Sequence, residues 1–532
     1  MPVKNDFGQY FTPRHIADLM VGMIKSERTA EVLEPSSGEG VFLDALYDQG
    51  FTNAQGYEID ERLTHNPAHK VTHRSFVSVS EASLFDVVIG NPPYIRWKNL
   101  TPELREEMQD HPLWGTLFNS LSDYLTVFIA NSVTHLTPGG ELIFITPSFW
   151  MHTSHSLKLR EWMLQHGHIS DVVDFGESKV FDGVSSAIII FRFVKSASES
   201  DSFNYHRYIG PRAVPTTINL GNQYFETHSA PTFKRGKHWT LAPAKTQEEA
   251  NRLELAATLG SQTPHSLLDG NQPDTLGNYV EIANGMVSGL DKAFRLSPEE
   301  YESLPQEELT GVSFVAKAKD LGHLKNLGIT PYIDVPEGMS ERDFNNAFPQ
   351  ISAKLAFFKE ALDKRYSYGR SLPYWEWAFK RSQKLFYTDR PKIFTPCKER
   401  MTNKDTARFA YVEGGILATQ DVTAIIPTPN TRESIEYILG YLSTKQVSDW
   451  FRVRGLMKGG IAEFSEKPLM NIPFLPIDWD SESSISFHNH ITNAVKEILS
   501  KKKASDPCTL QWLSTQFEEQ ISHINATHQE LS

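Results

Sequence analysis

The residues that could carry chemistry most directly form a short turn, Asn91-Pro92-Pro93-Tyr94, which follows the apolar run 86–89 and Gly90. The apolar run predicts a buried parallel strand. The two prolines fix φ at successive positions and remove two backbone donors, so Asn91 is held stiffly where the strand ends, at the edge where open α/β sheets bind ligands. The Asn91 amide, the Pro92 carbonyl and the Tyr94 ring could together hold a flat ring that carries an amino group. Taken alone, these residues could also form a plain proline turn beside an aromatic side chain.

A glycine-containing loop lies upstream of this turn. Residues 31–34 have the pattern of a strand, the loop Pro35-Ser36-Ser37-Gly38-Glu39-Gly40 follows, and residues 41–46 have the pattern of a helix. The run 55–60 predicts a second strand, and its acid Glu58 stands 20 residues after Gly38, the spacing at which an acid reaches ribose hydroxyls. The loop lacks a full G-x-G-x-x-G pattern, so its glycines alone do not specify the ligand.

The alternation of strands and helices continues through the first 200 residues. The pattern predicts a helix over residues 122–136 and strands over residues 141–146, 168–175 and 187–194. Such alternation is typical of a doubly wound α/β domain with a mostly parallel sheet. The polar stretch 195–203 predicts a domain edge, beyond which the alternation ceases.

Length and composition limit the class of protein. A chain of 532 residues has room for two or three domains, and 40% hydrophobic with 22% charged residues is ordinary for a globular protein. No apolar run approaches bilayer length and the first residues lack the apolar region of a signal peptide, so we expect a cytoplasmic protein. Two cysteines, Cys397 and Cys508, provide neither a disulfide framework nor a zinc cluster, and we expect no metal.

The second half contains a basic and aromatic stretch. Residues 354–408 hold 14 Lys and Arg against 6 Asp and Glu, with eleven aromatic side chains among them, although the net charge of the whole chain is −13. Basic residues among aromatics suit a nucleic-acid face, through phosphate contacts and base stacking. The alternative is that the aromatics belong to the core and the charges to a solvated surface.

Together, the ordered motifs resemble the S-adenosylmethionine-dependent DNA adenine-N6 methyltransferases of the γ arrangement, in particular the TaqI-like type II modification enzymes. The resemblance covers about residues 7–195 and reappears more weakly at residues 284–294, 440–443 and 459–460. It implies a class I methyltransferase fold with a mostly parallel seven-stranded sheet in residues 1–200. A mixed α+β target-recognition domain is implied for residues 201–480, followed by a helical tail over residues 481–532. The size and the opening of the chain are similar to those of methyltransferases with XhoI-type specificity (CTCGAG).

The resemblance also implies a set of cofactor contacts. Thr12, Ser36 and Gly38 match positions near the methionine moiety, Glu34 suits its ammonium group, and Glu58 matches the acid that binds the ribose. Where the family usually has Asp-Phe beside the cofactor adenine, this chain has Ser75-Phe76. Phe76 can still pack on the adenine, whereas Ser75 can bind its amino group only without a charge.

For catalysis the resemblance assigns Asn91, Pro92, Pro93 and Tyr94 as the motif that holds the target adenine, and Phe181 as the aromatic on the far face of that base. The Asn91 amide oxygen and the Pro92 carbonyl oxygen would accept the two amino hydrogens and localise the lone pair of the nitrogen. The base must leave the duplex to be reached, and stacking between Tyr94 and Phe181 would offset part of that cost.

The implied partners are duplex DNA and a cognate restriction endonuclease on a separate chain, with the methyltransferase acting as a monomer. A nuclease fused to this chain is not expected, because the cofactor motif begins at residue 7 and no metal-binding carboxylate cluster is evident downstream.

Other functions remain open at this point. A protein-glutamine methyltransferase also uses Asn-Pro-Pro-Tyr but has no use for 300 further residues, and an RNA-base methyltransferase would share the chemistry. A nicotinamide dehydrogenase would need the full glycine fingerprint. A DNA-recognition subunit without activity would not need the cofactor motifs.

Overall fold

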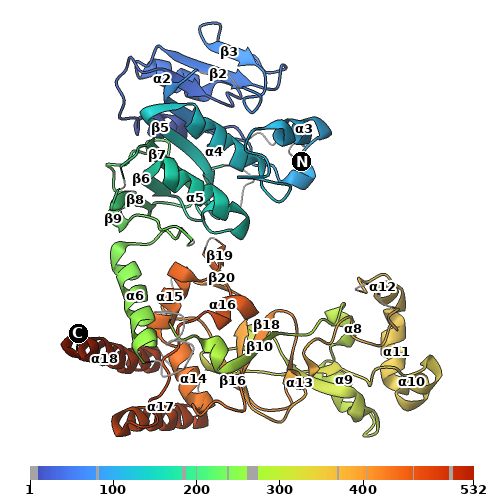
Figure 1. Cartoon of the computed structure of the whole chain (residues 1–532). Coiled ribbons are helices and arrows are strands. Elements are labelled where there is room, and N and C mark those ends of the chain that lie inside the picture. Colours follow the sequence, from blue (N-terminus) through green and yellow to red (C-terminus); the bar gives the residue numbers. More distant parts are fainter. Residues whose placement is uncertain are drawn as a thin grey trace. The chain divides into compact units, whose positions relative to one another are not determined.

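The computed structural model describes residues 10–79, 83–181, 187–198, 200–236, 239–260, 273–367, 369, 371–402, 404–458, 460–501 and 507–531. The chain divides into two compact units, Met1–Lys245 and Thr246–Ser532. Each has its own sheets and hydrophobic core, and each is described by itself (Figure 1).

The first unit is built on a nine-stranded sheet in the order β3-β2-β1-β4-β5-β7-β6-β8-β9. Pairing is parallel except that β7 runs antiparallel between β5 and β6, and β9 runs antiparallel to β8. The strands are β1 (Val32–Glu34), β2 (Ala54–Glu58), β3 (Lys70–His73), β4 (Phe85–Gly90), β5 (Leu136–Pro147), β6 (Gly167–Asp174), β7 (Ile188–Lys195), β8 (Ser202–Tyr208) and β9 (Phe225–Pro231).

Helices cover both faces of this sheet, because neighbouring residues of its buried strands point to opposite sides. In β4, Val87 and Ile89 join the core formed with α1 and α2, whereas Val88 joins the core formed with α3, α4 and α5. The helices are α1 (Arg14–Val21), α2 (Val41–Asp48), α3 (Pro102–Asp110), α4 (Tyr124–Thr134) and α5 (Leu157–His166), with short 3₁₀ turns η1 (Trp97–Asn99), η2 (Ser148–Met151) and η3 (Ser154–Ser156). The predicted doubly wound α/β fold is confirmed.

The sheet is larger than the seven strands predicted. β8 and β9 extend it beyond residue 200, β8 pairing in parallel with β6 and β9 pairing with β8. The polar stretch after β7 is therefore a connection between strands, and the first compact unit ends at Lys245. β5 also begins at Leu136, five residues before the predicted strand, and its pairing with β4 shows a register shift between Phe85 and Val87.

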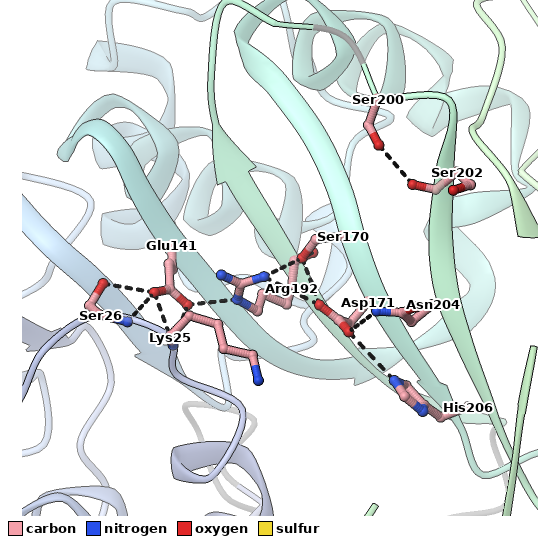
Figure 2. Close-up of polar contacts among 10 residues, drawn as sticks. All are labelled: Lys25, Ser26, Glu141, Ser170, Asp171, Arg192, Ser200, Ser202, Asn204 and His206. Atoms are coloured by element: carbon pink, nitrogen blue, oxygen red, sulfur yellow. Dashed lines mark hydrogen bonds and ion pairs between the residues drawn. The ribbon is translucent and has the colours of Figure 1, made fainter. Parts of the chain in front are cut away.

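A network of charged and polar side chains ties the strands of this unit together (Figure 2). Glu141 on β5 accepts hydrogen bonds from the backbone N–H groups of Lys25 and Ser26 and from Arg192 Nε of β7, the last at 2.6 Å. Arg192 Nη1 in turn lies 3.3 Å from Asp171 Oδ2 of β6. The network thus connects the loop after α1 with the centre of the sheet.

Asp171 is the second carboxylate that Arg192 contacts in this network. Burial alone raises the pKa of Asp171, but hydrogen bonds with His206, Asn204 and Ser170, together with the charge of Arg192, outweigh that effect and hold the pKa well below its usual range. The ionised carboxylate therefore stabilises the fold above the pKa of an unfolded aspartate, and this contribution is lost as the pH falls toward the depressed value.

The second unit contains three sheets, in the orders β10-β18-β14-β16-β12, β13-β11-β17 and β15-β20-β19. Its strands are β10 (Val280–Asn284), β11 (Val312–Ala316), β12 (Leu324–Lys325), β13 (Thr330–Ile333), β14 (Lys392–Pro396), β15 (Lys398–Arg400), β16 (Ala410–Val412), β17 (Leu417–Ala418), β18 (Val422–Pro427), β19 (Met457–Lys458) and β20 (Ile461–Glu463). Its mixed α+β character is as predicted.

Helices surround these sheets. They are α6 (Ala244–Leu259), α8 (Asp291–Phe294), α9 (Pro298–Glu302), α10 (Glu341–Ala347), α11 (Pro349–Phe357), α12 (Lys359–Asp363), α13 (Gln383–Phe386), α14 (Ile435–Leu442), α15 (Lys445–Arg454), α16 (Glu466–Met470), α17 (Glu482–Ser500) and α18 (Pro507–Leu531), with 3₁₀ turns η4 (Leu276–Asn278), η5 (Glu308–Gly311) and η6 (Ala318–Asp320). α17 and α18 pack on α14 and α15, so the helical tail belongs to this unit. Within the described residues, no helix is long and apolar enough to cross a membrane.

Candidate active site

A cavity opens at the carboxyl edge of strands β1, β2, β3 and β4, because parallel strands end on the same side of a sheet. The sequence analysis named twelve site residues, and eleven of them line this cavity: Thr12, Glu34, Ser36, Gly38, Glu58, Ser75, Phe76, Asn91, Pro92, Pro93 and Tyr94. Residues 7–9 of the amino-terminal motif lie outside the described residues.

The glycine loop forms one wall of the cavity, and two glycines, Gly38 in the loop and Gly56 in β2, allow its conformation. Gly38 has φ +55°, which side-chain-bearing residues rarely adopt, and its N–H donates to Glu58 Oε2 at 2.7 Å. A Cβ on Gly56 of β2 would lie 2.1 Å from Ser37 Oγ, so only glycine fits between the loop and the strand. The second Glu58 oxygen accepts from the Asp60 N–H at 2.8 Å, and this fixes the carboxylate at the end of β2.

Glu34 is a buried carboxylate at the end of β1, with 1% of its surface exposed. The Leu43 N–H donates to it, but Oε2 has no hydrogen-bond partner among the described residues. Burial raises the pKa of Glu34 well above its usual value, and the nearby Glu58 carboxylate adds to this effect. An unpartnered buried carboxylate oxygen beside a cavity suits a ligand that brings a cation or a hydrogen-bond donor.

Asn91 lies at the end of β4 and is held on three sides. Its Nδ2 donates to the Tyr10 carbonyl oxygen at 2.8 Å and to Thr12 Oγ1 at 3.1 Å. Its backbone carbonyl accepts from Ser36 Oγ at 3.0 Å. The described residues supply no hydrogen bond to the neighbouring Pro92 carbonyl, which leaves that acceptor available. The site thus presents two acceptor oxygens.

Tyr94 completes the turn as a neutral side chain. Its hydroxyl contacts Asn91 Oδ1 and donates to the Ile145 carbonyl oxygen at 2.7 Å. Burial raises the pKa of Tyr94 well above 10, so the phenol stays protonated and does not act as a base at neutral pH. The Tyr10 ring stacks on the Tyr94 ring with centroids 6.2 Å apart.

Ser75 and Phe76 follow β3 and also line the cavity. The Ser75 hydroxyl accepts from the Val77 N–H at 3.3 Å. Phe76 is only 2% exposed, and its ring contacts Tyr57 and Phe128. Phe76 therefore presents little surface to the cavity.

Phe181 is the predicted residue that does not line the cavity. It is 5% exposed in the core formed with α1 and α2, and its ring centroid lies 6.5 Å from that of Tyr10. Residues 182–184, which continue the motif around it, lie outside the described residues.

Sequence reasoning missed Tyr10, Arg74 and Tyr124, which also line the cavity. Tyr10 carried a usable signal, because it stands two residues before Thr12 in the same motif. Tyr124 begins a helix far from any motif, and its position follows only from the packing of α4 on the sheet.

The basic and aromatic stretch of the second unit is mostly structural. Tyr374, Trp375, Trp377 and Phe386 are buried in the core of that unit, whereas Phe357 and Tyr366 are exposed; Tyr368 and Arg370 lie outside the described residues. Many of the cations have acidic partners, as in the pairs Lys354–Glu300, Lys359–Glu341, Lys364–Glu360, Lys380–Asp334, Lys404–Glu399 and Arg408–Glu399. For the buried aromatics, the core alternative is the correct one.

Comparison with known proteins identifies the family. Residues 39–181 match the Eco57I restriction-modification methylase family, and residues 3–59 match the N-6 DNA methylase family. The chain is 40% identical to the type II methyltransferase M.HindII of Haemophilus influenzae over 505 residues, 94% of this chain and 96% of that protein, and 38% identical to M.HincII of the same species over 94% and 95%.

The structure resembles that of MmeI, a type IIL restriction-modification enzyme solved in complex with DNA, with a TM-score of 0.62 and 12% identity over 96% of this chain and 72% of that one. This likeness concerns the fold, whereas the identity to M.HindII over nearly the whole of both proteins establishes kinship. The chain belongs to the type II DNA methyltransferases of restriction-modification systems, within the family of N6-adenine DNA methylases.

Proposed function

We propose that this protein transfers a methyl group from S-adenosylmethionine to N6 of an adenine that is flipped out of duplex DNA. The observation that carries the proposal is the pair of acceptors at the end of β4. The Asn91 side chain and the Pro92 carbonyl lie in the same cavity as the unpartnered Glu34 carboxylate and the fixed Glu58 carboxylate.

The residues of the cavity fit S-adenosylmethionine. Glu34 Oε2 would accept a hydrogen bond from the ammonium group of its methionine part, and the Glu58 carboxylate would accept from the ribose hydroxyls. Ser75 and Phe76 border the space for the adenine. When bound, S-adenosylmethionine supplies an electrophilic methyl group on a sulfonium.

Glu34 makes cofactor binding depend on pH. Because burial raises its pKa, Glu34 keeps its proton to a higher pH than an exposed glutamate does, and a cationic ligand requires the ionised form. We therefore expect the affinity for S-adenosylmethionine to rise as the pH rises through that pKa, with protons released on binding. Calorimetry in buffers of different ionisation enthalpy would measure this release.

The variant Glu34→Gln tests whether Glu34 binds the ammonium group. It removes the charge at constant size, and we expect it to weaken binding by about 10- to 100-fold, the range for a hydrogen bond to a charged group, and to abolish the proton release. A Glu34→Gln variant that binds normally and still releases protons would show that another group holds the ammonium.

Methyl transfer requires the adenine amino group to become a nucleophile. The Asn91 amide oxygen and the Pro92 carbonyl oxygen would accept its two hydrogens and favour a tetrahedral nitrogen with a localised lone pair. Positive charge then develops on that nitrogen, where these two fixed oxygens and the Tyr94 ring stabilise it. Tyr94 stays protonated, so the rate comes from positioning and electrostatics rather than from that phenol acting as a base.

The aromatic side chains Tyr94 and Phe181 are proposed to stack on the flipped adenine. Unstacking an adenine costs a few kcal/mol, and stacking on Tyr94 offsets part of this cost. Phe181 is the proposed second face of the stack. In this structure it is 5% exposed and contacts the Tyr10 ring, so the proposal requires a rearrangement around residue 181 when DNA binds.

The second unit, Thr246–Ser532, is the proposed target-recognition part. The sequence assigned residues 201–480 to this role, of which residues 201–245 belong to the first unit. The chain would act as a monomer in the cytoplasm and protect host DNA from an endonuclease on a separate chain. The base sequence that it reads, for which the sequence analysis suggested CTCGAG, stays a prediction.

Expression in a host without its own adenine methylation tests this function. Genomic DNA from cells that express the chain should contain N6-methyladenine at one short sequence motif, and DNA from cells without it should contain none. Modified cytosine in place of adenine, or no modified base, would contradict the proposal.

A further inference from the structure

We propose that Thr12 is a positioning residue for Asn91: its hydroxyl, with the Tyr10 carbonyl, holds the Asn91 amide so that the oxygen is the atom offered to the target base. This rests on the proposed function, because it concerns how the same site presents its acceptor. It gives the Thr12 hydroxyl a role at the catalytic turn.

An asparagine amide at this position needs to be oriented. The backbone of Asn91 is fixed by β4 and the two prolines, but its terminal amide can turn by half a revolution and exchange its oxygen and nitrogen. In the wrong orientation the side chain would direct two N–H donors at an amino group that itself needs an acceptor. The site would then lose the hydrogen bond that activates the substrate.

The contacts around the side chain determine the orientation. The Tyr10 carbonyl oxygen, 2.8 Å from Asn91 Nδ2, can only accept, so the atom facing it must be the nitrogen. Thr12 Oγ1 lies 3.1 Å from the same nitrogen and accepts its second hydrogen. The Tyr94 hydroxyl contacts the opposite atom, Oδ1, but its single proton goes to the Ile145 carbonyl, so this contact does not fix the orientation. The Tyr10 carbonyl requires the nitrogen on its side, and Thr12 Oγ1 supports that orientation as an acceptor.

Thr12 is firmly held by its surroundings. Thr12 is 7% exposed and precedes Pro13, which restricts it to an extended backbone. The Pro13 carbonyl accepts from the Ile16 and Ala17 N–H groups at the start of α1, whose buried face packs against the sheet. Thr12 therefore cannot move without its helix, which makes it a firm support for the amide.

Ser36 supports the same residue from the opposite wall. Its hydroxyl donates to the Asn91 backbone carbonyl at 3.0 Å, so its single proton is already committed. Thr12 and Ser36, two of the four residues expected near the methionine part, thus have their hydroxyls bonded to Asn91, whereas Glu34 Oε2 has no hydrogen-bond partner among the described residues.

The test compares Thr12→Val, which keeps the shape but removes the hydroxyl, with the conservative variant Thr12→Ser. For each we would measure the dissociation constant for S-adenosylmethionine without DNA, and the single-turnover methylation rate at saturating cofactor. We expect Thr12→Val to lose about tenfold in rate, the effect of one hydrogen bond, with a change in cofactor affinity below about threefold. Thr12→Ser should keep the rate within about threefold.

A double-mutant cycle shows whether the effect passes through Asn91. In an Asn91→Ser background, where the shorter side chain cannot reach Thr12, adding Thr12→Val should change the residual rate by less than about twofold. Retained cofactor binding shows that each variant is folded.

Three outcomes would overturn the inference. These are weaker cofactor binding with an unchanged saturated rate, no effect of Thr12→Val on either quantity, or an equal loss in both backgrounds. A failure of the proposed function is recognised separately, because the wild-type protein would then bind cofactor but leave DNA unmodified.

Discussion

Replacing Asn91 by alanine should lower the methylation rate by at least about 10²- to 10³-fold, the loss seen when one preorganised hydrogen-bonding group is removed from a transition state. The variant loses the side-chain acceptor for the amino group, but it keeps Glu34 and Glu58, which lie on other strands. We therefore expect the dissociation constant for S-adenosylmethionine to stay within about threefold of the wild-type value. Single-turnover rates and equilibrium binding measure the two quantities separately.

Asn53→Ala is the matched control for this variant. Asn53 is exposed, and its side chain donates to the Thr29 carbonyl oxygen at 2.9 Å, away from the cavity. Its truncation should leave the methylation rate unchanged. A near-normal rate in Asn91→Ala would exclude the amide oxygen as an activating group and would remove the main argument for the mechanism.

Replacing Arg192 by methionine should destabilise the first unit by about 3–5 kcal/mol, the cost of removing one partner from a buried ion pair. Arg192 bridges Glu141, whose side chain is 3% exposed, and Asp171, whose side chain is 13% exposed (Figure 2). The variant leaves the buried Glu141 carboxylate and the partly buried Asp171 carboxylate without the guanidinium between them. The backbone N–H groups of Lys25 and Ser26 still bond Glu141, but they carry no compensating charge.

Hydrogen exchange of β5 and β7 measures this loss without interference from the second unit, since it reports the opening of individual strands. Arg14→Met is the control, because Arg14 is 44% exposed and pairs with Asp18 and Asp48 at the surface. Its removal should cost no more than about 1 kcal/mol. Equal effects of the two substitutions would show that the buried network contributes no more than a surface pair.

The central sheet could be predicted because each of its central strands can be recognised from a short stretch of sequence. Buried apolar runs such as residues 86–89, each followed by a turn and a helix, identify parallel strands directly. β9 was missed because only one of its seven positions is buried. β8 has four buried positions, but polar residues stand among its aromatics, and both strands derive their place from pairing with other strands. Their contribution moves the end of the first compact unit to Lys245.

The cavity could be predicted because its residues lie in turns at strand ends, where sequence spacing fixes spatial proximity. The hydrogen bonds within the site could not, since they depend on side-chain orientation across segments up to 81 residues apart, as in the contact of Asn91 with Tyr10. For the same reason, the bonds of the Thr12 and Ser36 hydroxyls to Asn91 could not be predicted, and the assignment of these residues to the cofactor stays a prediction.

The second unit was the part of the chain whose binding surface was hardest to predict from the sequence. Basic and aromatic residues alternate there in the sequence, but folding places Trp375 and Trp377 in the core and pairs Lys354 and Lys380 with acids distant in the chain. Composition cannot distinguish such a core from a binding surface, because both need aromatic side chains and both need charges at their margins.

The most direct test of the whole account is a transfer experiment with purified protein, S-adenosylmethionine labelled in the methyl group, and DNA of mixed sequence. After digestion to nucleosides, the account predicts that the label is found in N6-methyladenine with the wild-type protein and is lost with Asn91→Ala. Label in another nucleoside, or in N6-methyladenine at equal rates with both proteins, would contradict it.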